Sequence, residues 1–156
     1  MKKKILVTGG AGYIGSHTVV ELFLSGYQPI IVDNMCNTSE RNIIGINNLL
    51  KTSIPFHNID CTDLDQMNIF FENHKDIHAV IHFAAYKSVG ESIEKPEKYY
   101  KNNIGSTEVL LKCLEKFNPI VFGFRSSISC TNRFHCIGSR YLFVAHLKRI
   151  QAPSNT

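Results

Sequence analysis

The sequence predicts an α/β fold, a doubly wound and Rossmann-like parallel sheet, because apolar strands and amphipathic helices alternate along most of its 156 residues. Two further observations favour this fold class. A glycine-rich turn joins the first expected strand to the first expected helix, and an acidic residue, Asp33, ends the second expected strand. In such a fold the crossovers are right-handed and a ligand binds at the carboxyl ends of the strands.

The first expected element is a strand at residues 5–7, whose continuous apolar character suits burial on both faces of a sheet. A turn with Gly9, Gly12 and Gly15 follows, and a helical pattern begins at Tyr13. Glycine allows a tight turn and the close approach of a pyrophosphate, which the free N–H groups of the first helical turn can bind. The sequence therefore predicts a nucleotide-phosphate site at this turn.

The second expected strand, residues 28–32, ends at Asp33, which lies 18 residues after Gly15. A carboxylate at this position accepts hydrogen bonds from the adenosine ribose hydroxyls and repels a 2′-phosphate. Asn34 follows it where an arginine would favour NADP, so the sequence favours NAD. The alternative is that Asp33 only begins a loop, and the surrounding pattern favours the ribose-binding interpretation.

The alternation continues with expected helices at 38–51, from 62 and from 95, and with expected strands at 54–58, 79–83 and 120–122. Thr62 and Asp65 resemble a capping box, and Pro96 suits the first turn of the long third helix of this series. Polar or small residues follow the expected strands, as suits a nucleotide that lies across the sheet: 9–15, 33–38, 60–61 and 83–87.

The composition, 44% hydrophobic and 19% charged, is ordinary for a globular domain. No apolar run approaches the roughly 18 residues of a membrane span. The apolar run after the opening lysines is too short for a signal peptide, so we expect a cytoplasmic protein without a membrane partner. The 5 cysteines include no Cys-x-x-Cys pair, which favours reduced thiols.

The charge pattern changes abruptly along the chain. Residues 1–118 carry 12 basic and 13 acidic side chains, whereas residues 119–156 carry 5 basic and no acidic ones. We therefore expect an NAD-binding domain over 1–122 and an atypical basic tail over 123–156 that lies outside the fold, as a frame change or alternative splice would produce. A sheet that ends after residues 120–122 would leave that strand as an unpaired edge.

Other features of the sequence predict no further site. Cys130, His135, Cys136 and His146 match no zinc-binding spacing, so we expect no metal. The basic tail could touch nucleic acid, but a disordered end is favoured and we expect no nucleic-acid partner. We expect His17 and His82 to be packed or hydrogen-bonded rather than catalytic.

Four segments carry a resemblance to a known family: Val7–His17, Asp33–Asn37, His82–Ser92 and Lys95–Asn103. Together they resemble the UDP-glucose 4-epimerases, which are extended short-chain dehydrogenases/reductases. The glycine spacing alone fits any extended member, whereas Lys87 and the run from Asp33 to Asn37 resemble the epimerases more closely. The resemblance covers residues 1 to about 122, the cofactor half of a chain usually over twice this length, so the expected fold is truncated.

The resemblance implies a cofactor, NAD, and a role for each residue of its site. The residues that the resemblance assigns to the pyrophosphate are Gly9, Gly12, Tyr13 and Ile14, within the turn that ends at Gly15. The residues assigned to the adenosine ribose and its phosphate are Asp33, Asn34, Asn37 and Thr38. The residues assigned to the adenine are Asp60 and Cys61. The residues assigned to the nicotinamide ribose side are Phe83, Ala84, Ala85 and Lys87, with Asn102 nearby.

The resemblance also implies a reaction, the isomerisation of UDP-galactose and UDP-glucose through a 4-keto intermediate, in which NAD takes a hydride from C4 of the sugar and returns it. The family's base belongs to a Tyr-x-x-x-Lys pair. The last tyrosine here, Tyr141, is followed four residues later by Ala145. We therefore expect no catalytic residue and no activity from this chain alone, with Ser126 and Ser127 as weak counterparts of the family's serine.

Two alternatives to an epimerase remain open. The first alternative is a non-catalytic, truncated NAD-binding module. The second is another extended short-chain dehydrogenase/reductase that acts on a nucleotide sugar. The resemblance implies a UDP-sugar partner for the full-length family in galactose metabolism, and a homodimer only where the full fold is present.

Overall fold

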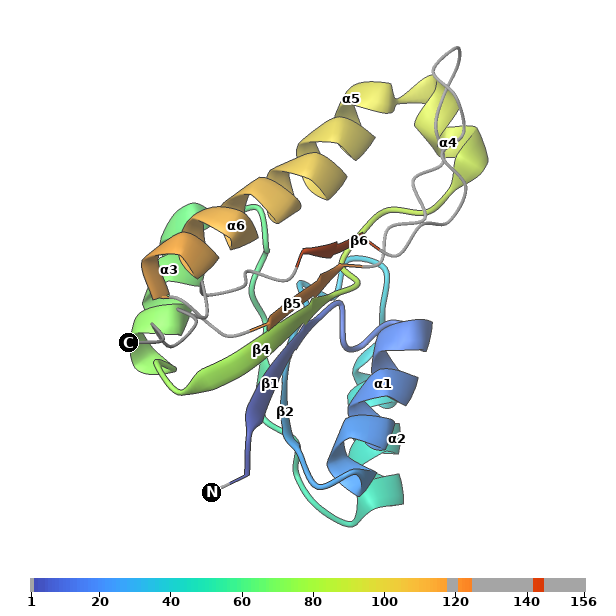
Figure 1. Ribbon diagram of the computed structural model, residues 1–156. Coiled ribbons are helices and arrows are strands. Elements are labelled where there is room, and N and C mark those ends of the chain that lie inside the picture. Colours follow the sequence, from blue (N-terminus) through green and yellow to red (C-terminus); the bar gives the residue numbers. More distant parts are fainter. Residues whose placement is uncertain (1, 118–120, 125–141, 145–156) are drawn as a thin grey trace, which may run out of the picture.

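The computed structural model describes residues 2–117, 121–124 and 142–144, whose strands form one six-stranded sheet (Figure 1). The strands are β1 (Lys4–Thr8), β2 (Gln28–Val32), β3 (Phe56–His57), β4 (Ile77–His82), β5 (Val121–Phe124) and β6 (Leu142–Val144). Their order is β3-β2-β1-β4-β5-β6, and the first five are parallel. This order confirms the predicted doubly wound fold, in which the chain starts at the centre and winds outward in both directions.

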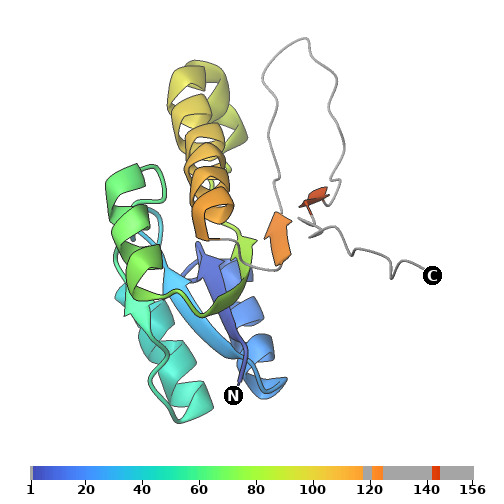
Figure 2. The same ribbon diagram turned by 60° about the vertical axis from the view of Figure 1, so that its left-hand side comes forward.

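Helices cover both faces of the sheet (Figures 1 and 2). One face carries α1 (Tyr13–Leu24) and α2 (Glu40–Leu50), and the other carries α3 (Leu64–Asn73) and α6 (Gly105–Phe117). Successive residues of β1 face opposite sides, so Leu6 packs into the α3–α6 core while Ile5 and Val7 pack into the α1–α2 core. Burial on both faces explains why the strand reads as an unbroken apolar run.

The long helix expected from residue 95 is present and contains a π-helical turn. Its segments are α5 (Pro96–Tyr99), the π-helix η1 (Tyr100–Ile104) and α6. Both views show this run extending past the carboxyl ends of the strands (Figures 1 and 2). A preceding short helix, α4 (Val89–Glu94), was not predicted, although the Ser88 side chain accepts a hydrogen bond from the backbone N–H of Glu91, as at a typical N-cap.

The capping box predicted for α3 is wrong by one residue. Asp63 is the N-cap, and its carboxylate accepts hydrogen bonds from the backbone N–H (3.0 Å) and the side-chain amide (2.7 Å) of Gln66. The Thr62 hydroxyl is instead engaged with Asp60, to which it donates at 2.7 Å. A carboxylate one residue later therefore takes the capping position, because the hydroxyl has a nearer acceptor.

The expectation of an unpaired edge at residues 120–122 is also wrong. The strand β6 pairs with β5 in antiparallel fashion, with Phe122 opposite Val144 and Phe124 opposite Leu142. These partners are 18 or more positions apart in sequence, so no local pattern indicated the pairing. The division of the chain at residue 122 remains a prediction.

His82, at the end of β4, joins three elements of the core. The residue is 1% exposed, its Nδ1 lies 2.6 Å from the Thr8 hydroxyl of β1, and its Nε2 lies 3.3 Å from the Ser106 hydroxyl of α6. Burial lowers the pKa of this imidazole to about 3, so the ring is neutral at neutral pH. The structure confirms the expectation that His82 is packed and hydrogen-bonded.

This burial predicts a dependence of stability on pH. His82 takes up a proton near pH 6.5 when the chain is unfolded and near pH 3 when it is folded. Between these values the unfolded state binds more protons, so stability falls as the pH is lowered, by up to about 1.4 kcal/mol per pH unit. Urea unfolding of His82→Asn between pH 7 and 4 should show a weaker pH dependence than the unmodified chain.

The matched control is His17→Asn, which removes an exposed imidazole and leaves His82 with its partners Thr8 and Ser106 in place. An equal pH dependence in His82→Asn and in the unmodified chain would show that His82 does not titrate on unfolding as described.

Candidate functional site

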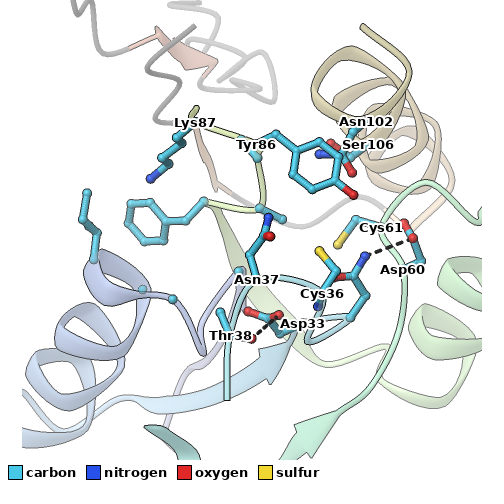
Figure 3. A pocket seen from close by; sticks show the side chains of 18 of the residues that line it. Asp33, Cys36, Asn37, Thr38, Asp60, Cys61, Tyr86, Lys87, Asn102 and Ser106 are labelled. Carbon is cyan, nitrogen blue, oxygen red and sulfur yellow. Dashed lines mark hydrogen bonds between the residues drawn. The ribbon is translucent and has the colours of Figure 1, made fainter. Parts of the chain in front are cut away.

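A cavity of about 530 Å³ lies at the carboxyl ends of the parallel strands (Figure 3). Its walls come from the glycine turn after β1 and from the loops after β2, β3 and β4, with one side closed by the helical run from Pro96. All the residues singled out in the sequence line it: Gly9, Gly12, Tyr13, Ile14, Gly15, Asp33, Asn34, Asn37, Thr38, Asp60, Cys61, Phe83, Ala84, Ala85, Lys87 and Asn102. The topology thus brings together segments that are distant in sequence.

The glycine turn leaves no room for side chains at two positions. Gly9 has a φ of +68°, and a Cβ placed there would lie 2.5 Å from the backbone nitrogen of Ala84. A Cβ on Gly15 would overlap the carbonyl oxygen of Gly9. The N-cap of α1, Gly12, offers no side-chain acceptor to the first helical turn. The backbone N–H groups there are therefore available to an anion in the cavity.

Asp33 connects the glycine turn to the loop after β2. Its Oδ2 accepts a hydrogen bond from the backbone N–H of Ala11 (3.1 Å). Its Oδ1 accepts from the backbone N–H of Met35 (2.9 Å) and from the Thr38 hydroxyl (3.1 Å). The residue is only 7% exposed, yet it lines the cavity. The carboxylate is consequently fixed at the position where the sequence predicted a ribose contact.

Asp60, after β3, holds a second fixed carboxylate at the same end of the cavity. It accepts hydrogen bonds from the Asn34 side chain (3.0 Å), the Thr62 backbone N–H (2.8 Å) and the Thr62 hydroxyl (2.7 Å). Burial alone would raise its pKa, but these hydrogen bonds outweigh burial and hold the pKa of Asp60 below its usual value. Asp60 is therefore ionised at neutral pH.

The neighbouring thiol of Cys61 is chemically inert. Burial, and then the charges of Asp60 and Asp33, raise the pKa of Cys61 to about 12. A thiol with this pKa holds its proton at neutral pH, and only the thiolate is a nucleophile. Cys61 therefore contributes surface to the cavity rather than reactivity.

The opposite wall is the loop after β4. The backbone N–H of Phe83 donates to the carbonyl of Thr8 (2.9 Å), which extends the contact between β4 and β1 to the edge of the cavity. Beyond it, Asn103 binds both polar groups of one peptide: its Oδ1 accepts from the N–H of Tyr86 (2.8 Å) and its Nδ2 donates to the Tyr86 carbonyl (3.1 Å). This amide fixes the loop that carries Lys87.

The π-helical turn gives the adjacent asparagines of η1 different roles. Asn103 is buried against the loop, while Asn102 lines the cavity and donates from its Nδ2 to Asn103 Oδ1 (2.9 Å). π-helical turns are frequent at functional sites. Sequence reasoning identified Asn102 but missed Asn103, although two adjacent amides inside an otherwise amphipathic helix were a usable signal.

The cavity also has wall residues to which the sequence analysis gave no individual role: Cys36, Ile59, Tyr86, Ser88, Glu91, Tyr99 and Ser106. Glu91 is prominent among them, since it accepts hydrogen bonds from the Lys98 ammonium (2.7 Å) and the Tyr99 hydroxyl (3.0 Å). These contacts join α4 to α5, so the missed helix α4 helps to shape one wall of the cavity.

The part of the chain that the structure describes contains neither a group of side chains placed to hold a metal ion nor a helix able to span a membrane. No group of three or more His, Cys, Asp or Glu side chains in residues 2–117, 121–124 and 142–144 is placed to hold a metal ion. Cys130, His135, Cys136 and His146 lie outside those residues, as do Ser126, Ser127 and Tyr141. Among the described helices, none has the length and apolar character that crossing a membrane requires.

Known proteins share both the sequence and the fold of this chain. A UDP-glucose 4-epimerase of Schizosaccharomyces pombe is 48% identical over 123 residues, which are 79% of this chain and 34% of that protein. A UDP-glucose 4-epimerase of Dictyostelium discoideum is 43% identical over 134 residues, which are 86% of this chain and 39% of that protein. The chain thus spans little more than a third of the length of these relatives.

Solved structures give the same result. A UDP-glucose-4-epimerase from Stenotrophomonas maltophila, with bound NAD and formylated UDP-arabinopyranose, superposes with a TM-score of 0.77 at 39% identity, covering 87% of this chain and 40% of that one. The Bifidobacterium longum UDP-glucose 4-epimerase, in complex with NAD+ and UDP, also superposes with a TM-score of 0.77. It is 41% identical, and the match covers 81% of this chain and 37% of that one.

The sequence profile of the NAD dependent epimerase/dehydratase family matches residues 5–134, and this range includes every residue singled out along the cavity. The glycine turn, the acid after β2 and the parallel sheet all fall within the match. The chain therefore belongs to the NAD dependent epimerase/dehydratase family.

Proposed function

We propose that the cavity binds NAD and that the chain serves the reaction of the UDP-glucose 4-epimerases, the isomerisation of UDP-galactose and UDP-glucose. The observation that carries this proposal is one cavity that brings together the glycine turn, Asp33 and Asp60 at the carboxyl edge of a parallel sheet. The bound NAD of the Stenotrophomonas and Bifidobacterium neighbours supports the choice of cofactor.

The residues of the cavity fit the parts of an NAD molecule in order. The turn at Gly9–Gly15, where a Cβ would fill the space, takes the pyrophosphate together with Tyr13 and Ile14. Asp33, Asn34, Asn37 and Thr38 would hold the adenosine ribose, and Asp60 and Cys61 would lie beside the adenine. Phe83, Ala84, Ala85 and Lys87 would line the nicotinamide ribose side, with Asn102 nearby.

The chain's own residues account for cofactor binding but not for proton transfer. When bound, NAD would supply the hydride acceptor and donor for C4 of the sugar. The C4 hydroxyl must lose its proton at the same time, and a tyrosine does this only when a neighbouring cation lowers its pKa from about 10. No tyrosine in the 156 residues is followed four positions later by lysine.

This missing pair favours a second function for the chain as it stands, a non-catalytic NAD-binding module. The glycine spacing also fits another extended short-chain dehydrogenase/reductase acting on a nucleotide sugar. The epimerase assignment is favoured over that alternative by the relatives named above, all of which are UDP-glucose 4-epimerases.

Cofactor choice is the first test. The chain should bind NAD more tightly than NADP, because the Asp33 carboxylate repels a 2′-phosphate. Asp33→Asn removes this charge and should narrow the ratio of the two dissociation constants by about tenfold, which is about 1.4 kcal/mol. Isothermal titration with both dinucleotides measures the ratio.

The control variant is Asp63→Asn, which keeps a good N-cap on α3 outside the cavity and should leave the ratio of the two dissociation constants unchanged. Equal affinities in the unmodified chain would contradict the placement of Asp33.

The close approach at Gly15 gives a second test. Gly15→Ala forces the added methyl against the Gly9 carbonyl, so the turn must open and NAD affinity should fall at least about tenfold. The matched control is Gly105→Ala, whose Cβ meets nothing within 4 Å and which lies in a helix where alanine is preferred. Binding titrations and melting curves of both variants decide the result, and unchanged NAD affinity in Gly15→Ala would refute the proposed pyrophosphate site.

Catalysis is the third test. The 156-residue chain should show no interconversion of UDP-galactose and UDP-glucose in a coupled assay, even when NAD is bound, because its sequence lacks the Tyr-x-x-x-Lys pair that would take the C4 proton. The variant Gly12→Val, whose added side chain obstructs the glycine turn, gives the background rate of this assay. A rate above that background would demonstrate a replacement base, with Tyr141 the first residue to substitute.

A further inference from the structure

Tyr86 lies in the loop after β4, yet its side chain extends across the cavity toward the loops after β2 and β3. Figure 3 shows the ring between Asn102 and Ser106 on one side and Cys36 and Asn37 on the other. Its hydroxyl forms a hydrogen bond with the Cys36 thiol and interacts electrostatically with the Asp60 carboxylate. The ring therefore covers the end of the cavity where Asp33 and Asp60 are fixed.

The ring is held in this position without a ligand. The Lys98 ammonium lies 4.6 Å from the centroid of the Tyr86 ring, and the Tyr99 ring packs against it at 5.6 Å between centroids. Lys98 is itself fixed by Glu91 at 2.7 Å, and Asn103 binds both backbone polar groups of Tyr86. A side chain ordered before binding loses little conformational entropy when a ligand arrives.

Tyr86 does not supply the missing base. Burial, followed by the hydrogen bond with Cys36, raises the pKa of its hydroxyl, so the phenol stays protonated at neutral pH. The residue four positions later is Gly90 rather than lysine. What the site can use is the aromatic ring, because the flat face of a purine stacks favourably on an aromatic side chain.

We propose that Tyr86 is the platform on which the adenine ring of the dinucleotide stacks, closing the adenosine half of the cavity. The inference rests on the proposed NAD binding. The ribose contact at Asp33 places the base near Asp60, and Tyr86 is the aromatic side chain that the structure directs to this end from the opposite wall. Adenosine would thus be held between the loop after β2 and a ring supplied by the loop after β4.

The test uses ADP-ribose, which keeps the adenosine and the pyrophosphate and lacks the nicotinamide. Equilibrium titration of the full chain should show about a tenfold loss of affinity in Tyr86→Ala, the usual effect of removing one stacking ring. Tyr86→Phe keeps the ring and should bind within about threefold of the unmodified chain. Tyr100→Ala removes an exposed tyrosine of η1 outside the cavity wall, 65% exposed, and should have no effect.

A spectroscopic measurement separates stacking from a structural role. The adenine H2 and H8 proton resonances of bound ADP-ribose should shift upfield in the unmodified chain and in Tyr86→Phe, and this shift should be absent from Tyr86→Ala. Unchanged affinity in Tyr86→Ala, or an equal loss in Tyr86→Phe, would overturn the proposal. Failure of the unmodified chain to bind ADP-ribose or NAD would instead overturn the proposed function, on which the inference depends.

Discussion

The contact between the Gly9 carbonyl and the backbone at Gly15 is the constraint on which the rest of the site depends. It brings the start of α1 so close to the end of β1 that neither position has room for a Cβ. The N–H of Gly9 meanwhile donates to the Val32 carbonyl at 2.8 Å, which aligns the ends of β1 and β2. Both the shape of the glycine turn and the position of Asp33 follow from this packing.

The walls of the cavity are organised by side chains that bind the backbone of neighbouring loops. Asp33 orders the glycine turn and the loop after β2, Asp60 orders the loop after β3, and Asn103 orders the loop after β4. Each of these groups is fixed before a ligand arrives, so a ligand that fits the cavity has little loop ordering to offset. Asp33 and Asp60, which order two of these loops, also line the cavity.

The residues suited to a dinucleotide and the family's catalytic pair can be considered separately in this sequence. The groups suited to a dinucleotide lie between residues 9 and 106, on loops anchored in a well-packed sheet. The Tyr-x-x-x-Lys pair on which the family's chemistry relies does not occur in the 156 residues. The chain corresponds to little more than a third of its curated relatives, so binding and catalysis are best tested as independent properties.

Local patterns in the sequence determined the alternating strands and helices, the glycine turn and the acid after β2, because each depends on residues within a few positions of one another. The sixteen cavity residues named from the sequence do line one cavity, since parallel strands place their carboxyl ends together. Only the tertiary structure decided the pairing of β6 with β5, the clamp of Asn103 on Tyr86 and the burial of His82 against Thr8. Those contacts join residues from 17 to 74 positions apart, and no local periodicity encodes which distant side chains meet.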